Sequence, residues 1–258
     1  MKFNLPITVL TVLWILDFAA HLVLLVVILG RERWRRFPVF TLAIAFTALQ
    51  LLTSQLLTGR LPAMTMKALF LWMAAFTALV NILVAVEIAR RAFSRVKRSS
   101  WLAGALAAIL VGAAVLAFWG KWPTWHMLAA SPELNVVQFL AQKGLLLGNV
   151  EWVFVGLLVV ALGSRAGAGF RTHTQQIAIG LMVSAMSQLG IQALWERLAR
   201  SAMNRPVEEQ YRMMHLGDRL FNANRVIYLL VLIWWIATLW REEPGNSMAA
   251  GPLERSLP

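Results

Sequence analysis

Long apolar runs alternate with short charged segments along almost the whole chain. A helix needs about 20 predominantly apolar residues to cross the hydrocarbon core of a bilayer. Seven runs reach that length, which predicts an all-α fold: a polytopic membrane protein built as a seven-transmembrane helix bundle. The predicted spans are residues 6–29, 38–57, 68–89, 101–119, 136–162, 177–195 and 220–240.

Helix start signals mark two of the span boundaries. Pro38 stands where the second span begins, and Ser131 is the expected N-cap of the fifth helix, with Pro132 and Glu133 in its first turn. We expect residues 1–243 to form a single transmembrane domain. Residues 244–258 are expected to form a disordered cytoplasmic tail.

The basic residues predict the orientation of the chain, because cytoplasmic loops of membrane proteins are enriched in lysine and arginine. Thirteen basic residues lie at one set of span ends, against four at the N-terminus and in the first two loops of the other set. The N-terminus is therefore predicted outside and the C-terminus in the cytoplasm. The thirteen are Arg31, Arg33, Arg35, Arg36, Arg90, Arg91, Arg95, Lys97, Arg98, Arg165, Arg171, Arg241 and Arg255; the four are Lys2, Arg60, Lys67 and Lys121.

The segment 196–225 departs from this charge pattern, since it lies on the predicted outer side and holds six arginines. It also holds Glu208, Glu209 and Asp218. We interpret it as an outer surface loop that carries a short interfacial helix starting near Pro206.

Composition agrees with lipid as the main solvent: 59% of residues are hydrophobic and 14% charged, against about 25% charged in soluble domains. The net charge of +12 is spread over short loops, which argues against nucleic-acid binding and favours contact with anionic lipid headgroups. The chain has no cysteine, so thiolate chemistry and disulfides are excluded.

Two ionisable residues interrupt the first apolar run near its predicted midpoint. Asp17 and His21 are four residues apart, so they share one helical face. A charged group at the centre of a bilayer costs at least about 2.5 kcal/mol, so we expect both residues to face protein or water. They fit a ligand-binding or proton-sensing pair, or a purely structural polar contact.

Other spans carry polar residues at similar depth. Gln50, Asn81, Gln188 and Glu151 lie near the middle of their spans, and Ser184, Gln188, Gln192 and Glu196 recur every four residues. Such stripes can line one inner cavity that opens outward, or can hydrogen-bond between helices. On a helical wheel Glu151 points away from the cavity face, so we expect it to pair elsewhere, with Lys143 or with a partner subunit.

Small residues provide candidate helix contacts. Gly104, Ala108 and Gly112 in the fourth span and Gly144 and Gly148 in the fifth are spaced by four, which favours close helix packing inside the chain or homodimerisation.

Several familiar membrane sites do not fit the sequence. The four histidines lack the spacing of a zinc protease and give no matched pair for haem, so no metal or cofactor is predicted. The last span has no lysine for retinal, and neither a serine-nucleophile motif nor a phosphate-binding loop is present.

Three segments carry a resemblance: "RFPVF", "VQFLAQKGLLLGNVEWVFVGLLVV" and "NRVIYLLVLIWWIATLWREEP". The chain resembles a group of uncharacterised seven-span integral membrane proteins common in acidobacterial genomes. The resemblance implies the seven-span architecture and a place in the bacterial inner membrane. It implies no activity, substrate or site residue.

Taken together, these patterns predict a non-enzymatic membrane protein with a polar intramembrane core. We expect a small-ligand sensor or an accessory subunit of a membrane complex, with a membrane subunit or a second copy as partner. The alternative is a small-solute or proton-coupled transporter that uses the same polar layer. The candidate site residues are Asp17, His21, Gln188, Gln192 and Glu151.

Overall fold

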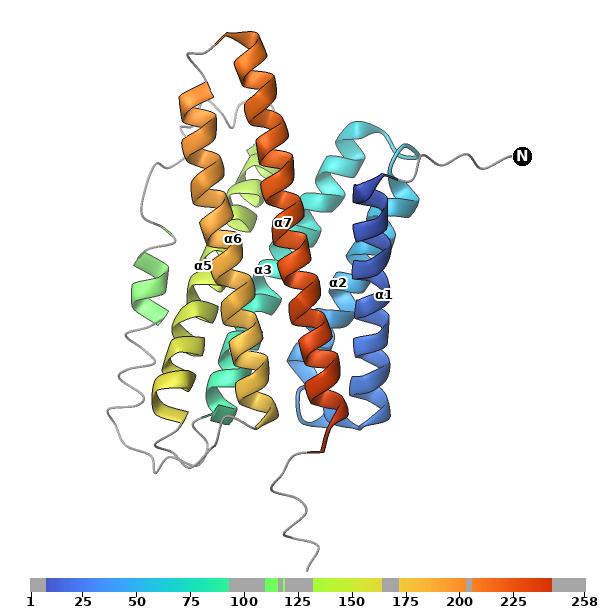
Figure 1. The fold of residues 1–258 in the computed structure, drawn as a ribbon, viewed down its shortest axis with the longest axis vertical. Helices are drawn as coiled ribbons and strands as arrows, with labels where there is room; N and C mark the ends of the chain where they lie inside the picture. Colours follow the sequence, from blue (N-terminus) through green and yellow to red (C-terminus); the bar gives the residue numbers. More distant parts are fainter. Residues whose placement is uncertain are drawn as a thin grey trace, which may run out of the picture.

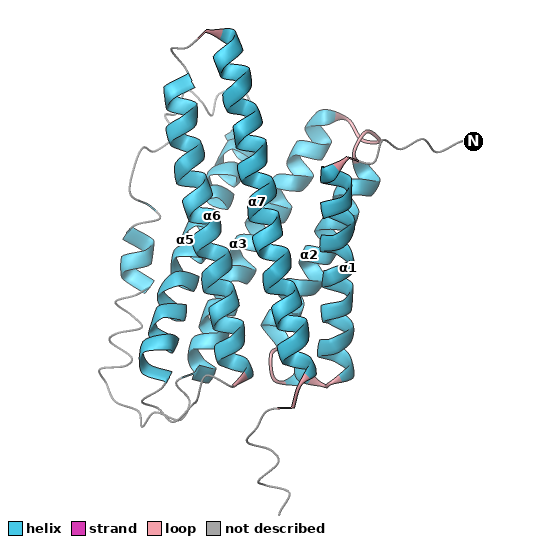
Figure 2. Cartoon of the chain, viewed as in Figure 1, coloured by secondary structure: helices cyan, strands magenta, loops and turns pink. Residues whose placement is uncertain are grey.

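The computed structural model describes residues 8–92, 110–115, 118, 132–163, 172–202 and 206–242. Within these residues the chain is all-α, as predicted, and is built from long helices (Figures 1 and 2). Six of the helices are long and apolar enough to cross a membrane, so the chain has the build of a multi-pass membrane protein. They are α1 (Val9–Gly30), α2 (Pro38–Leu57), α3 (Ala63–Ala92), α5 (Pro132–Gly163), α6 (His173–Ala202) and α7 (Val207–Trp240), with the short 3₁₀ helix η1 (Arg33–Arg35) after α1.

The predicted fourth span, residues 101–119, lies mostly outside the described residues, although residues 110–115 are helical. The predicted cap Ser131, the ridge residues Gly104 and Ala108, and the tail 244–258 also lie outside them. The second span is found at its predicted bounds, and the fifth helix begins at Pro132 as expected.

The six long helices form a ring. Each packs against the next in the order α1, α2, α3, α5, α6 and α7, and α7 packs back on α1. α3 also contacts α6 across the ring, and Figure 1 shows α3 running obliquely behind α6 and α7.

Two neighbouring pairs of helices run parallel. His21 of α1 contacts Tyr228 of α7, and further along both helices Arg31 lies over the ring of Trp240. Similarly, Gly144 and Gly148 of α5 lie against Ala78 and Asn81 of α3. The glycines therefore serve packing within the chain.

The main hydrophobic core fills only one half of the bundle. Its members come from the C-terminal halves of α1, α3, α5 and α7 and the N-terminal halves of α2 and α6. We call this the closed half, which lies at the bottom of Figure 1, and the other the open half. The largest fully buried residues of the closed half are Trp235, Phe37, Phe40, Leu24, Ile28, Ile88, Ile177, Leu232 and Leu239.

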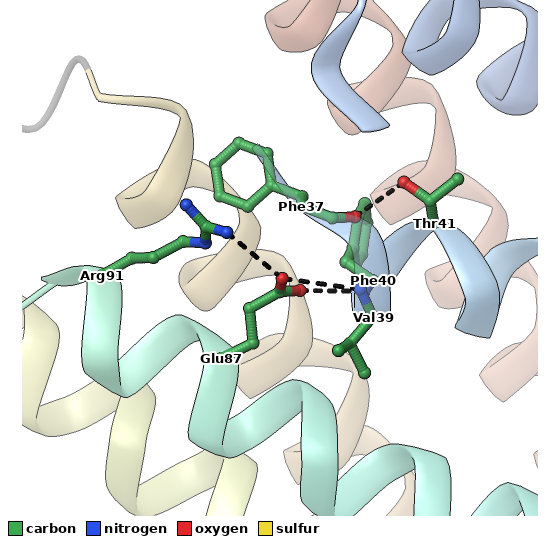
Figure 3. Close-up of polar contacts among 6 residues, drawn as sticks. All are labelled: Phe37, Val39, Phe40, Thr41, Glu87 and Arg91. Carbon is green, nitrogen blue, oxygen red and sulfur yellow. Dashed lines mark hydrogen bonds and ion pairs between the residues drawn. The ribbon is translucent and has the colours of Figure 1, made fainter. Parts of the chain in front are cut away.

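A carboxylate from one helix caps another in the closed half (Figure 3). The α2 N-terminus has Phe37 at its N-cap and no side-chain cap of its own. Glu87 of α3 instead accepts hydrogen bonds from the backbone N–H groups of Phe40 at 2.9 Å and Val39 at 3.4 Å, and pairs with Arg91 at 3.5 Å. Because free N–H groups and the helix dipole both favour an anion, Glu87 ties α3 to α2.

The α6–α7 connection differs from the predicted outer loop 196–225. α6 continues to Ala202, and α7 begins at Val207, next to the predicted start near Pro206, then runs unbroken for 34 residues. This length of about 51 Å exceeds the roughly 30 Å hydrocarbon core. Polar residues continue both helices because they pack against each other: Gly217 of α7 lies against the ring of Trp195 of α6.

Candidate functional site: a polar cluster between α1 and α7

His21 is completely buried and bonded through both ring nitrogens. Its Nδ1 lies 2.7 Å from the backbone carbonyl oxygen of Asp17, and its Nε2 lies 3.1 Å from the hydroxyl of Tyr228. The carbonyl can only accept, so Nδ1 carries the proton. In the neutral ring Nε2 is then an acceptor, and the Tyr228 hydroxyl donates to it. This contact joins the middle of α1 to α7.

Asp17 is also buried, with 8% of its surface exposed, and its side chain is not satisfied by the histidine. His21 contacts the backbone carbonyl of Asp17, while the carboxylate oxygen Oδ1 has no hydrogen-bond partner in the described part of the chain. A buried acceptor without a donor is costly, and such groups are rare in folded proteins. The contact between the two residues therefore uses the backbone of Asp17, and it leaves the acid available for another partner.

An arginine lies at the same level as this acid. Asp17 precedes His21 by one turn of α1, and Arg225 precedes Tyr228 by about one turn of α7. Because the two helices run parallel and His21 contacts Tyr228, Asp17 and Arg225 occupy neighbouring positions one turn above that contact.

The inward face of α6 changes from buried to exposed as it passes this level. Ile177, Leu181 and Ser184 are buried at 0%, 5% and 5% exposure. The same stripe continues with Gln188, Gln192 and Glu196, which are exposed. These residues share one helical face by their spacing. This stripe of α6 is therefore packed in the closed half and exposed in the open half.

Gln188 and Gln192 thus lie above the polar cluster and do not touch it. Gln192 donates to Glu196 at 3.4 Å along its own helix. Beside this stripe, Ser187 of α6 donates to Asn224 of α7 at 2.7 Å, one turn above Tyr228. Polar groups from α6 and α7 therefore line the approach to Asp17 from the open half.

Glu151 is separate from this cluster. It lies on α5, which packs against α3 and α6, whereas Asp17 and His21 lie where α1 packs against α7. Glu151 is 2% exposed, and its Oε2 has no hydrogen-bond partner within the described ranges. The expected pairing of Glu151 with Lys143 is not among the contacts that the structure shows.

The other mid-span polar residues join neighbouring helices. Gln50 of α2 donates to the Met73 carbonyl at 3.1 Å and to the Thr77 hydroxyl at 2.7 Å, both on α3. At Asn81 it is the backbone carbonyl, not the side-chain amide, that accepts from the indole of Trp152 on α5 at 2.9 Å. For Gln50 the structural interpretation, a hydrogen bond between helices, accounts for the side chain.

Three residues of functional interest were not identified from the sequence. Tyr228 looks like an ordinary aromatic residue of an apolar span, although it is one of only two tyrosines in the chain. Arg225 was assigned to the outer loop because of its charge. Glu87 lies at a span end, where acidic residues are common, and the missing local cap before Pro38 was the signal that α2 needs an acceptor from elsewhere.

Within the described residues no group of three or more histidine, aspartate or glutamate side chains is placed to hold a metal ion. Comparisons with models of known protein families, with curated proteins and with solved structures find no match. The function must therefore be argued from the site itself.

Proposed function

We propose that this protein is a non-enzymatic membrane sensor of a small solute, or a ligand-binding accessory subunit of a membrane complex. The observation that carries the proposal is the α6 stripe, which becomes exposed where it passes a buried acid with an unpartnered oxygen. Placing an unpaired acid within a membrane span costs free energy, and such residues are typical of functional sites.

The two halves of the bundle support a binding site that is reached from one side only. The closed half is filled by side chains from six helices, among them Leu24, Ile88 and Trp235. The open half exposes Gln188 and Gln192 on the corresponding inner face. A solute that enters the open half would therefore meet Asp17 and stop at the closed half.

We further propose seven crossings, with the open half outside a bacterial inner membrane. α3 and α5 run parallel, so the chain has to return across the bundle between Ala92 and Pro132, where the apolar run 101–119 is available. The closed half ends in arginines of the kind that cytoplasmic loops collect, and anionic lipid headgroups are their proposed partners. These arginines are Arg31, Arg33, Arg35, Arg36, Arg90, Arg91 and Arg241.

The absence of native cysteine allows a direct test. Single cysteines at Gln188 and Gln192 should react with a membrane-impermeant methanethiosulfonate added outside intact spheroplasts. Met186→Cys is the matched control, because Met186 is 54% exposed but on the opposite side of α6, toward lipid. Leu181→Cys, on the buried part of the stripe, should also stay unmodified. Reaction at Gln188→Cys no faster than at Met186→Cys would refute the open polar half.

A transporter is the rival function, because an open and a closed half also describe one state of alternating access. Ser184→Cys distinguishes the two, since Ser184 is the last buried residue of the stripe before the exposed Gln188. A sensor should keep this thiol unreactive toward reagent added to inside-out vesicles. A transporter should expose it from that side and should carry protons or solute across liposomes loaded with a pH-sensitive dye.

A further inference from the structure

We infer that the site takes a small zwitterion of the α-amino-acid class, with its ammonium group on Asp17 and its carboxylate on Arg225. This inference rests on the proposed function, since it names the ligand of the same site. It follows from the position of two opposite charges at one level of neighbouring helices.

The acid side of the site has the properties of a receptor for an ammonium group. Asp17 is 92% buried by area, and Oδ1 has no donor among the described residues. The neighbouring residues one turn below already form other hydrogen bonds. His21 uses both of its ring nitrogens, and the Tyr228 hydroxyl donates to His21. A donor for this oxygen therefore has to arrive with a ligand or with water, and an ammonium group supplies the charge as well as the hydrogen bond.

The cationic side is a guanidinium that the fold does not use. Arg225 is exposed, and the structure gives it neither a hydrogen bond nor an ion pair within the described ranges. A guanidinium presents two parallel N–H groups that match a carboxylate. Arg225 is therefore suited to bind the acid end of a ligand whose amine end reaches Asp17.

The two groups lie at one level of neighbouring helices and yet are not in contact. No nitrogen of Arg225 lies within 4.0 Å of an Asp17 carboxylate oxygen. Opposite charges at one level that do not pair with each other are matched by a molecule that carries both charges, which a simple cation or anion would not balance. The polar approach formed by Gln188, Ser187 and Asn224 admits such a hydrophilic molecule from the open half.

The test uses the intact chain, purified in detergent, and measures thermal unfolding with each common L-amino acid. We expect at least one of them to raise the unfolding temperature. The amide of that amino acid, which lacks the carboxylate, and its N-acetyl form, which lacks the ammonium, should each bind at least tenfold more weakly. No stabilisation by any amino acid, or equal binding of the free amino acid and its amide, would overturn the inference.

Two variants assign each ligand group to its residue. Arg225→Gln should abolish the difference between the free amino acid and its amide, and Asp17→Asn should abolish the difference between the free and N-acetylated forms. Asp218→Asn and Arg219→Gln are control variants with the same changes of charge, because both residues are exposed on α7 outside the cluster, and they should bind as the parent does. If the preferences survive in Arg225→Gln and Asp17→Asn, the assignment is wrong.

The cysteine experiment separates this inference from the proposed function. If Gln188→Cys reacts from outside but no amino acid binds, the open site stands and only its ligand class is wrong. If Gln188→Cys does not react, both fail. A bound amino acid should also slow the reaction of Gln188→Cys, whereas ethylamine and propanoate should not.

Discussion

Each half of the α6–α7 pair contains a glycine packed against a tryptophan, and the two pairs differ in how firmly the tryptophan is held. In the closed half, Gly180 faces Trp235, which is 1% exposed, packs edge-on against Phe40 at 5.1 Å and donates to the Gln176 carbonyl at 3.3 Å. In the open half, Gly217 faces Trp195. Trp195 is only half-buried, and its ring neighbour is the exposed Phe221 at 5.8 Å.

The comparison shows that one pair of helices is tightly packed at one end and exposed at the other. The closed half is packed on every side, so a side chain there cannot move without displacing several others. The open half is held mainly by contacts between adjacent helices and leaves inner faces accessible. Rigidity at one end and accessibility at the other are what a binding site entered from one side requires.

The largest predicted effect would break the closed half at its helix cap. Glu87→Ala removes the acceptor for the N–H groups of Val39 and Phe40 and leaves them buried, which should lower the free energy of unfolding by about 3 kcal/mol. SDS titration of mixed micelles, followed by circular dichroism, measures it. Glu87→Gln keeps one acceptor oxygen and should cost about 1 kcal/mol. A Glu87→Ala variant as stable as the parent would show that the cap does not hold the closed half together.

The second prediction compares the two glycines directly. A Cβ at Gly180 would lie 2.3 Å from Nε1 of Trp235, and one at Gly217 would lie 2.1 Å from Cζ3 of Trp195. Trp235 cannot move away, so Gly180→Ala should cost about 2 kcal/mol. Trp195 can turn toward solvent, so Gly217→Ala should cost less than about 1 kcal/mol. The same SDS titration reports both.

Gly190→Ala is the control for this series, since nothing lies within 4 Å of a Cβ there. It should raise stability by up to about 1 kcal/mol through helix propensity alone. Equal losses at Gly180 and Gly217 would mean that the two halves are equally rigid, and the distinction drawn above would not hold.

The sequence predicts helix bounds correctly where the apolar run and the helix have the same length. The second span matches α2 at both ends, because its polar neighbours begin where the helix stops. α6 and α7 are longer than predicted, because residues 196–202 and 207–219 are also helical, and there Gly217 of α7 packs against the ring of Trp195 of α6. Apolarity alone does not detect a helix that continues into water.

For the candidate site, the sequence identifies the ionisable residues that are unfavourable in lipid. It does not identify the residues that form hydrogen bonds with them. Asp17 and His21 stand out as ionisable groups in an apolar run, and the structure buries both. Their neighbour Tyr228 is compatible with an apolar span, so nothing in its sequence context marks it. The exposure of Gln188 is a property of the assembled bundle rather than of any one segment.

The smallest predicted effect concerns the boundary between the two halves. Tyr228→Phe removes the hydroxyl that donates to His21 and should cost about 1 kcal/mol. The chain offers a matched control in its only other tyrosine, because Tyr211 lies on the same helix, is 62% exposed, and should tolerate phenylalanine without loss. Equal, near-zero effects of the two substitutions would mean that the His21 contact does not join α1 to α7.

The same variant sharpens the comparison when it is combined with Gly180→Ala. Tyr228 and Trp235 are seven residues apart on α7, about 10 Å along the helix. Substitutions at that separation add when the sites share no partners. Additive losses in the double variant would place the His21–Tyr228 contact outside the closed core, so that a ligand can alter the site while the closed half stays intact. A coupling above about 1 kcal/mol would instead make the site part of the closed core, and ligand binding would then strain the whole bundle.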